Sequence, residues 1–148
     1  AHREMMAAVA ERAPDAHVFG VVVQPMLRGG NDLIIGARLD PNFGHVVLVG
    51  MGGVFVEVFR DTAIRVAPFP KSAADAMLRE LKVWPVLEGV RGQEPSDVEA
   101  LSEAILGVTR LVTDFPEIAE LDINPIRVRA EGDGCLALDA RMSLTPAP

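Results

Sequence analysis

The side chains best suited to chemistry lie between Phe115 and Leu144, in FPEIAELDINPIRVRAEGDGCLALDARMSL. Polar and apolar residues alternate here, so a strand would place Glu120, Asp122 and Asn124 on one face. The turn sequence EGDG then predicts an antiparallel hairpin that brings Asp139 close to Asn124. Carboxylate and amide oxygens without His or Cys suit Mg²⁺ better than zinc. The pattern is compatible with a magnesium site, and also with acids that are simply solvated on the wet face of a sheet.

Length and composition describe an ordinary globular chain. Its 148 residues are 49% hydrophobic, which is enough for one folded domain with a core. The single cysteine, Cys135, excludes an internal disulfide and fits a reducing compartment. The net charge of -7 argues against nucleic acid or an anionic membrane as the partner. No apolar run approaches the roughly 20 residues that span a bilayer, so we expect a cytoplasmic protein.

The elements that position these side chains begin with a short helix in HREMMAAVAERAPDA, which Pro14 stops. The β-branched run 17–26 (HVFGVVVQPM) predicts a strand buried on both faces. The turn LRGGN would join it in a hairpin to a second strand at 32–40, and a turn at 40–44 follows. Further β-rich segments predict strands at 45–50, 54–61 and 63–67.

Helices follow where the apolar period changes. Residues 72–84 carry an apolar stripe with Ser72 as the N-cap, and Pro85 ends it. The strongest helix signal has Ser96 as its cap and Glu99 at the capping-box position. Three short strands complete the chain, at about 117–123, 125–130 and 135–142. This order of elements predicts an α+β fold in which helices pack against a largely antiparallel sheet.

Three stretches resemble a known family: the segment from Val21 to Asp61, the loop LEGVRGQEPSD, and the segment from Phe115 to Leu144. They are similar to the carboxy-terminal part of the ATP-grasp domain in NDP-forming acyl-CoA synthetases, relatives of succinyl-CoA synthetase β chains. The resemblance covers nearly the whole chain. It implies an ATP-grasp subdomain that forms a single domain over 1–148, with a tail at 145–148. The uncapped start without Met suggests a fragment of a longer protein.

The resemblance implies metal-binding roles for particular residues. In that family the Asn of an Asp-x-Asn-Pro strand and the Asp of a following Asp-Ala-Arg strand hold Mg²⁺ on the nucleotide phosphates. These positions match Asn124 and Asp139. Asp122 would be a third group or a water-mediated contact. Arg141 would balance the acids, touch a phosphate or form a structural ion pair.

The strand end VQPM resembles the ATP-grasp hinge that recognises adenine. Backbone groups of Gln24 and of Met26 or Leu27 would bond the base. Val23 and Met26 would be apolar walls of the site, or plain core. Relatives usually carry Glu where this chain has Asp32, so the carboxylate expected near the nucleotide reaches less far here.

The activity implied is Mg-dependent phosphoryl transfer between ATP or ADP and a phosphohistidine, during interconversion of an acyl-CoA and its acid. The partners implied are an upstream ATP-grasp half and a CoA-ligase domain or subunit that carries the phosphohistidine. We expect no catalytic side chain in this chain, His45 included, and no turnover by the fragment alone. The alternatives are a regulatory synthetase-like module of a protein lysine acetyltransferase, another ATP-grasp ligase, or a non-catalytic sheet domain.

Overall fold

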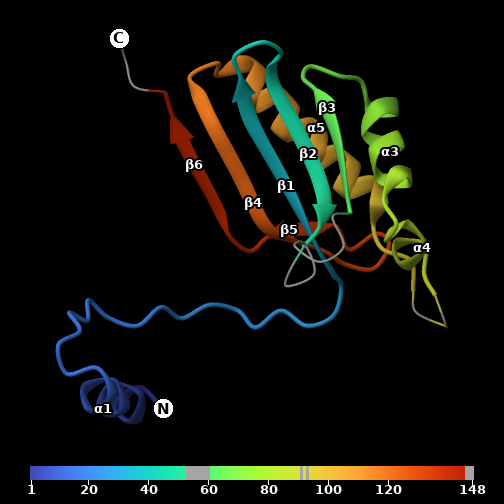
Figure 1. Ribbon diagram of the computed structural model, residues 1–148. Coiled ribbons are helices and arrows are strands. Elements are labelled where there is room, and N and C mark those ends of the chain that lie inside the picture. The colour runs from blue at the N-terminus through green and yellow to red at the C-terminus, as the bar shows by residue number, and fades with distance from the viewer. Residues whose placement is uncertain (53–60, 91, 93, 146–148) are drawn as a thin grey trace.

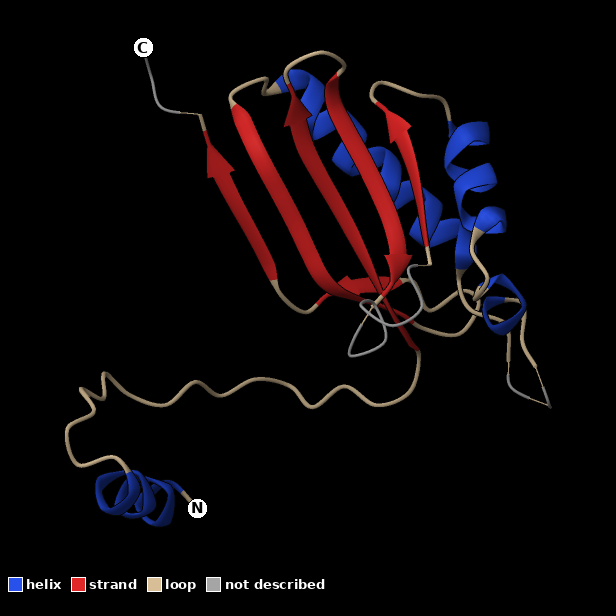
Figure 2. Ribbon diagram, in the orientation of Figure 1, coloured by secondary structure: helices blue, strands red, loops and turns tan. Residues whose placement is uncertain are grey.

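A computed structural model of the chain has a six-stranded sheet with helices on one face and an open second face (Figures 1 and 2). The structure describes residues 1–52, 61–90, 92 and 94–145. Every strand pairing is antiparallel, so the predicted α+β class is confirmed. The described elements, in chain order, are α1 (His2–Arg12), β1 (Asn31–Asp40), β2 (Gly44–Met51), β3 (Thr62–Val66), α3 (Lys71–Glu80), α4 (Trp84–Leu87), α5 (Val98–Asp114), β4 (Ile118–Val128), β5 (Cys135–Ala137) and β6 (Ala140–Leu144).

Strand β1 lies inside the sheet, because it pairs with β2 on one side and with β4 on the other. The strand order is β3-β2-β1-β4-β5, and β6 also pairs with β4. Since β1 occupies one edge of β4, strands β5 and β6 follow one another along its other edge. The short helix predicted before Pro14 is confirmed as α1, and the strands predicted at 32–40, 45–50 and 63–67 are confirmed as β1, β2 and β3. Residues 54–60 of the strand predicted at 54–61 lie outside the described residues, and Asp61 is not part of a strand.

The predicted strand at 17–26, and its hairpin with 32–40, are wrong. Residues 17–28 form no strand and run as a separate segment between α1 and β1 (Figure 1). A strand that is buried on both faces needs neighbouring strands and covering side chains, and the described part of the chain supplies neither for this segment. Because β2 and β4 take both edges of β1, no edge of β1 is left for residues 17–26.

The three short strands predicted at the end of the chain are also divided differently. Strand β4 continues through Pro125 instead of stopping there. The β1–β4 register shifts at this point, between Leu33 and Ile35, so that a bulge accommodates the missing proline donor. The segment predicted as one strand at 135–142 is split into β5 and β6, which pair with different parts of β4.

Helices α3 and α5 close one face of the sheet and form the core with it (Figure 2). An apolar stripe along α5 packs against strand side chains that alternate with the open-face residues. A fully buried aliphatic side chain stabilises the fold by about 1.5–3 kcal/mol. The buried stripe and strand residues are Leu101, Ile105, Val108 and Val112 of α5, Leu33, Ile35 and Ala37 of β1, Val47 and Val49 of β2, and Leu121, Ile126 and Val128 of β4.

The helical region predicted at 72–84 is one helix followed by a short second one. Helix α3 has Pro70 at its N-cap position, so the predicted Ser72 cap is wrong. The helix ends because Leu81 takes an extended conformation with ψ 137°. The buried carboxylate of Asp61 accepts hydrogen bonds from the two backbone N–H groups that follow Leu81, at 2.7 and 2.8 Å. This carboxylate fixes the break between α3 and α4.

Helix α5 is capped by Asp97 rather than by Ser96. Asp97 Oδ1 accepts a hydrogen bond from the Ala100 N–H at 2.9 Å, while Oδ2 accepts from Gly132 and Gly134 at 3.0 and 2.9 Å. The Ser96 hydroxyl is committed elsewhere, because it accepts a hydrogen bond from the side chain of Asn31. Asp97 therefore joins the start of α5 to the turn between β4 and β5.

Candidate functional site

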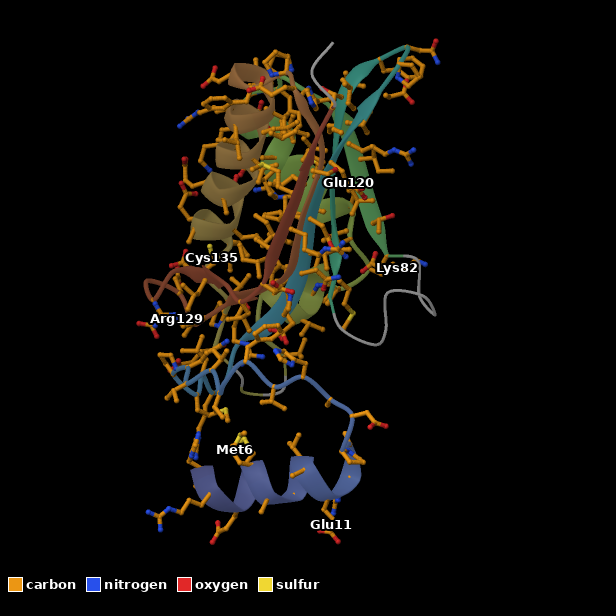
Figure 3. All side chains as sticks on the ribbon, turned by 90° about the vertical axis from the view of Figure 1, so that its left-hand side faces the viewer. Met6, Glu11, Lys82, Glu120, Arg129 and Cys135 are labelled. Carbon is orange, nitrogen blue, oxygen red and sulfur yellow. The ribbon has the colours of Figure 1, made fainter. Side chains whose placement is uncertain are left out.

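The open face of the sheet holds the acids that the sequence singles out. Figure 3 views the sheet nearly edge-on, with α5 on one side and Glu120 on the other. A depression of about 600 Å³ on this face is lined by residues of all four neighbouring strands β1 to β4. Gly36 lies opposite Asp122 on one side and Leu48 on the other, so the sheet has no side chain at this point. The depression therefore combines an apolar floor with carboxylates at its edge.

The ladder between β4 and β6 brings the predicted metal residues together. Asp122 lies directly opposite Arg141, and the Asn124 N–H donates to the Asp139 carbonyl at 3.1 Å. Asp122 and Asn124 are two residues apart on β4 and share a face. Asp139 comes just before β6, and its backbone lies beside Asn124, next to the Asp122–Arg141 pair. Asn124 and Asp139 are exposed, and Asp122 is half-buried. A small cavity of about 130 Å³ adjoins Asp122 and Arg141.

The donor set on this ladder fits a hard cation. Its members offer two carboxylates and one amide oxygen, the ligand types that Mg²⁺ prefers, and Mg²⁺ takes few protein ligands. Across the described part of the chain, no three His, Cys, Asp or Glu side chains are grouped as a metal site would need. The predicted set reaches three only by counting the Asn124 amide. Arg141 makes no ion pair with any described residue, so the structural pair that was one alternative for it is absent.

The predicted adenine hinge faces strand β5 at the lower end of the sheet. Gln24, Met26 and Leu27 line a cavity of about 360 Å³, together with Arg127 and the β5 segment around Leu136. Of the two predicted apolar walls, Met26 lines this cavity and remains 84% exposed. Val23 does not line the cavity and is 90% exposed, so neither residue is core in the described chain.

Asp32 does not stand alone, because Arg127 engages both of its carboxylate oxygens. Arg127 Nε and Nη2 donate to Asp32 Oδ1 and Oδ2, each at 2.8 Å. These hydrogen bonds raise the pKa of the Arg127 guanidinium above its ordinary value. Arg127 was not among the site residues predicted from the sequence. The alternation in IRVRA places it on the open face, but its pairing with Asp32 depends on the β1–β4 register.

Other titratable side chains are engaged in the fold. His45 is buried, and its Nε2 donates to the Ile118 carbonyl at 2.7 Å, which links β2 to the start of β4. Lys71 forms ion pairs with Glu99 at 2.9 Å and with Asp75 at 3.2 Å, so it joins α3 to α5. Hydrogen bonds to Glu99 and Asp75 raise the pKa of Lys71. Neither side chain lines the depression on the open face.

The chain is similar to known proteins over most of its length. A family model described as ATP-grasp domain matches residues 1–144. The β subunit of ADP-forming acetate–CoA ligase II from Pyrococcus furiosus is 44% identical over 132 residues, which are 88% of this chain and 56% of that subunit. ADP-forming 4-hydroxybutyrate–CoA ligase from Nitrosopumilus maritimus is 46% identical over 129 residues, which are 87% of this chain and 18% of that protein.

A solved structure has the same fold. Dinucleotide-forming acetyl-coenzyme A synthetase 1 from Ca. Korarchaeum cryptofilum superposes with a TM-score of 0.76 and 43% sequence identity, over 80% of this chain and 55% of that one. That protein was solved with coenzyme A and Mg-AMPPCP, and with a phosphohistidine segment pointing towards its nucleotide-binding site. This chain thus spans 56% of the Pyrococcus subunit and a smaller share of the Nitrosopumilus protein.

No helix within the described ranges is both long enough and apolar enough to cross a bilayer.

Proposed function

We propose that this chain, which belongs to the ATP-grasp family, forms a nucleotide-binding part of an NDP-forming acyl-CoA synthetase. The reaction is phosphoryl transfer between ATP or ADP and a phosphohistidine, during interconversion of an acyl-CoA and its acid. The names of the relatives support this reaction, because they are ADP-forming acid–CoA ligases. The Korarchaeum structure supports it through its bound coenzyme A, its Mg-nucleotide analogue and its phosphohistidine segment.

One observation carries the proposal: the β4–β6 ladder gathers oxygen donors on the only sheet face that the described helices leave open. The Asn124–Asp139 backbone hydrogen bond and the Asp122–Arg141 pairing support this, because they make these residues neighbours. Asn124 and Asp139 would hold Mg²⁺, with Asp122 as a third group. The bound ion would supply positive charge to the nucleotide phosphates. Arg141 would add a second, permanent cation beside them.

The positions of Arg127 and Asp122 along β4 suggest how the nucleotide is oriented. The hinge cavity adjoins Arg127, and the metal ladder lies at Asp122 to Asn124. Arg127 lies opposite Asp32, and Asp122 lies opposite Gly36, four residues further along β1, so at about 3.3 Å per residue the two positions are roughly 13 Å apart. We place adenine against Met26 and the backbone of Gln24 to Leu27, and the phosphates toward Asp122. Asp32 lies at the adenine end, beside Arg127.

The partners follow from surfaces that the described chain leaves uncovered. Phe19 and Val22 are 94% and 78% exposed in a segment whose composition is typical of a buried strand. An upstream ATP-grasp half would pair with this segment and cover the open face, and so exclude water from the phosphates. A CoA-ligase domain or subunit would present the phosphohistidine. Charge contacts strengthen when water leaves such a site.

The test uses the protein that carries this chain, supplied with acetyl-CoA, inorganic phosphate and Mg-ADP. We expect ATP formation and a phosphorylated histidine, while purified residues 1–148 form no ATP because the open face of the sheet stays in contact with water. Binding of Mg-ADP is measured separately by calorimetry. A carrier protein that binds no Mg-ADP contradicts the proposal. Binding without any phosphoryl transfer, across several acyl-CoA substrates, supports the regulatory alternative instead.

A further inference from the structure

The hinge segment, residues 17–28, makes few hydrogen bonds with the sheet. Among the described residues, a single hydrogen bond ties the stretch 17–28 to the sheet: Arg127 Nη1 donates to the Leu27 carbonyl at 3.1 Å. The same guanidinium donates through its other two nitrogens to both oxygens of Asp32. One side chain on β4 therefore contacts β1 and the hinge at once.

This contact is held in place from several sides. Asp32 lies directly opposite Arg127 in the β1–β4 ladder, so the strand register sets their approach. The Asp32 backbone carbonyl also accepts a hydrogen bond from the Gly52 N–H at 2.8 Å. The side chains of Arg127 and Asp32 are 21% and 32% exposed, so water screens the pair only in part. A fork that donates to a carboxylate in two parallel bonds has a fixed orientation.

The path from the hinge to β1 is fixed at a second point. Gly30 takes a positive φ of 81°, and a Cβ added there would come within 2.5 Å of the Val128 carbonyl oxygen. The backbone after Leu27 thus presses against the end of β4. Arg127 and Gly30 together determine how the chain passes from residues 24–27 into β1.

We propose that Arg127 is a positioning residue for the nucleotide site and that Asp32 acts through it. The pair orients the Leu27 carbonyl and so sets the geometry of the hinge backbone that meets adenine. This inference rests on the proposed function for the identity of the ligand. It changes the role expected of Asp32: both carboxylate oxygens serve Arg127, so the side chain orients the guanidinium rather than contacting the nucleotide.

Lys cannot replace Arg127 in this role. The guanidinium is planar and donates in three directions at once, whereas an ammonium at the end of a flexible chain lacks this fixed fork. The effect of the charge of Arg127 can therefore be tested separately from the effect of its shape. A conservative change that keeps the charge should lose the hinge contact.

The variants are made in the protein that carries this chain. We expect Arg127→Met, Arg127→Lys and Asp32→Asn each to weaken Mg-ADP binding by about tenfold, the size of one charge-assisted hydrogen bond. The kcat should change less than twofold, because the metal ladder is untouched. The double variant Arg127→Met with Asp32→Asn should bind Mg-ADP no more weakly than whichever single variant binds it more weakly. The reason is that the two side chains act through one contact. The control Arg65→Met removes an exposed ion pair with Glu80 and should leave binding unchanged.

A second measurement tests the tether without any nucleotide. The rate of tryptic cleavage after the exposed Arg28 should rise in Arg127→Met and in Asp32→Asn, and should stay unchanged in Arg65→Met, because loss of the bond to the Leu27 carbonyl frees this segment to enter a protease. Failure of the wild-type protein to bind Mg-ADP would overturn the proposed function and still leave this cleavage test valid. Additive losses of binding in the double variant would overturn the inference, because they require separate contacts. Unchanged binding and unchanged cleavage with a lowered Tm would also overturn it, since the pair would then be only structural. If Arg127→Met does not fold, the isosteric Asp32→Asn decides between these outcomes.

Discussion

The two faces of the sheet use the same strands for different purposes. On the helix face, β1, β2 and β4 present aliphatic side chains that α5 and α3 bury completely. On the open face, the alternate residues of those strands include Gly36, Glu120 and Asp122. Ile64 on this face remains 51% exposed, whereas Ile105 on α5 is fully buried. The helix face thus provides stability, and the open face keeps its polar groups available for a ligand.

The largest effect is expected on the helix face. Ile105→Ala in residues 1–148 should lower the free energy of unfolding by about 2–5 kcal/mol, because it opens a cavity in a close-packed core. The matched change Ile64→Ala on the open face should cost less than about 1 kcal/mol, because half of that side chain already meets water. Urea unfolding followed by circular dichroism measures both. Equal losses would mean that the two faces do not differ in packing.

The next effect belongs to the open face. Asp139→Asn in the protein that carries this chain should lower turnover by roughly 10²-fold, about 3 kcal/mol, as when one preorganised charge contact is removed. The Tm should barely change, because neutralising Asp139 also relieves repulsion from Asp122. Steady-state rates at several Mg²⁺ concentrations provide the measurement. Asp133→Asn, an exposed acid in the turn after β4, is the control. Normal turnover of Asp139→Asn at low Mg²⁺ would refute the metal assignment.

The hinge should respond to charge but not to loss of a polar side chain. Met26→Asp should weaken Mg-nucleotide binding by about 1–3 kcal/mol, because it places a carboxylate beside an apolar ring. Gln24→Ala should change affinity little, since only backbone groups of Gln24 are expected to meet adenine. Calorimetric titration with Mg-ADP compares the two variants. Equal losses would point to a side-chain role for Gln24.

The smallest effect concerns Asp97, which joins the helix layer to the β4–β5 turn. Backbone hydrogen bonds from Ala100, Gly134 and Gly132 hold the pKa of the Asp97 carboxyl below its ordinary value of 3.8. The stabilisation is therefore present above pH 3.8 and is lost as the pH falls through the lower, folded-state pKa. Asp97→Ala should cost about 1 kcal/mol at neutral pH, the usual value of an N-cap.

The difference between Asp97→Ala and the wild type should shrink as the pH falls below 3.8. Urea unfolding of both proteins at neutral pH and at acidic pH measures it. Glu103→Ala, an exposed position on α5, is the control and should show a difference that does not depend on pH in this way. A cost for Asp97→Ala that stays constant down to strongly acidic pH would contradict the assignment.

The sequence by itself determined the features that depend on local periodicity. Alternation along β4 assigned Asp122 and Asn124 to one face, and the EGDG turn predicted the return of the chain that brings Asp139 beside Asn124. The apolar stripe of α5 predicted a helix that lies on a sheet. These features need only neighbouring residues, because strand and helix periods are fixed by backbone geometry.

Tertiary structure decided the pairings and the exact ends of elements. Nothing in the run 17–26 reveals that β2 and β4 occupy both edges of β1, because strand partners are far apart in sequence. Asp97, not Ser96, caps α5, because folding brings Asn31 to Ser96 and the β4–β5 turn to Asp97. The Asp32–Arg127 pair likewise exists only in the β1–β4 register, which joins residues 95 positions apart. Such contacts depend on packing over the whole sheet, and local sequence does not encode that packing.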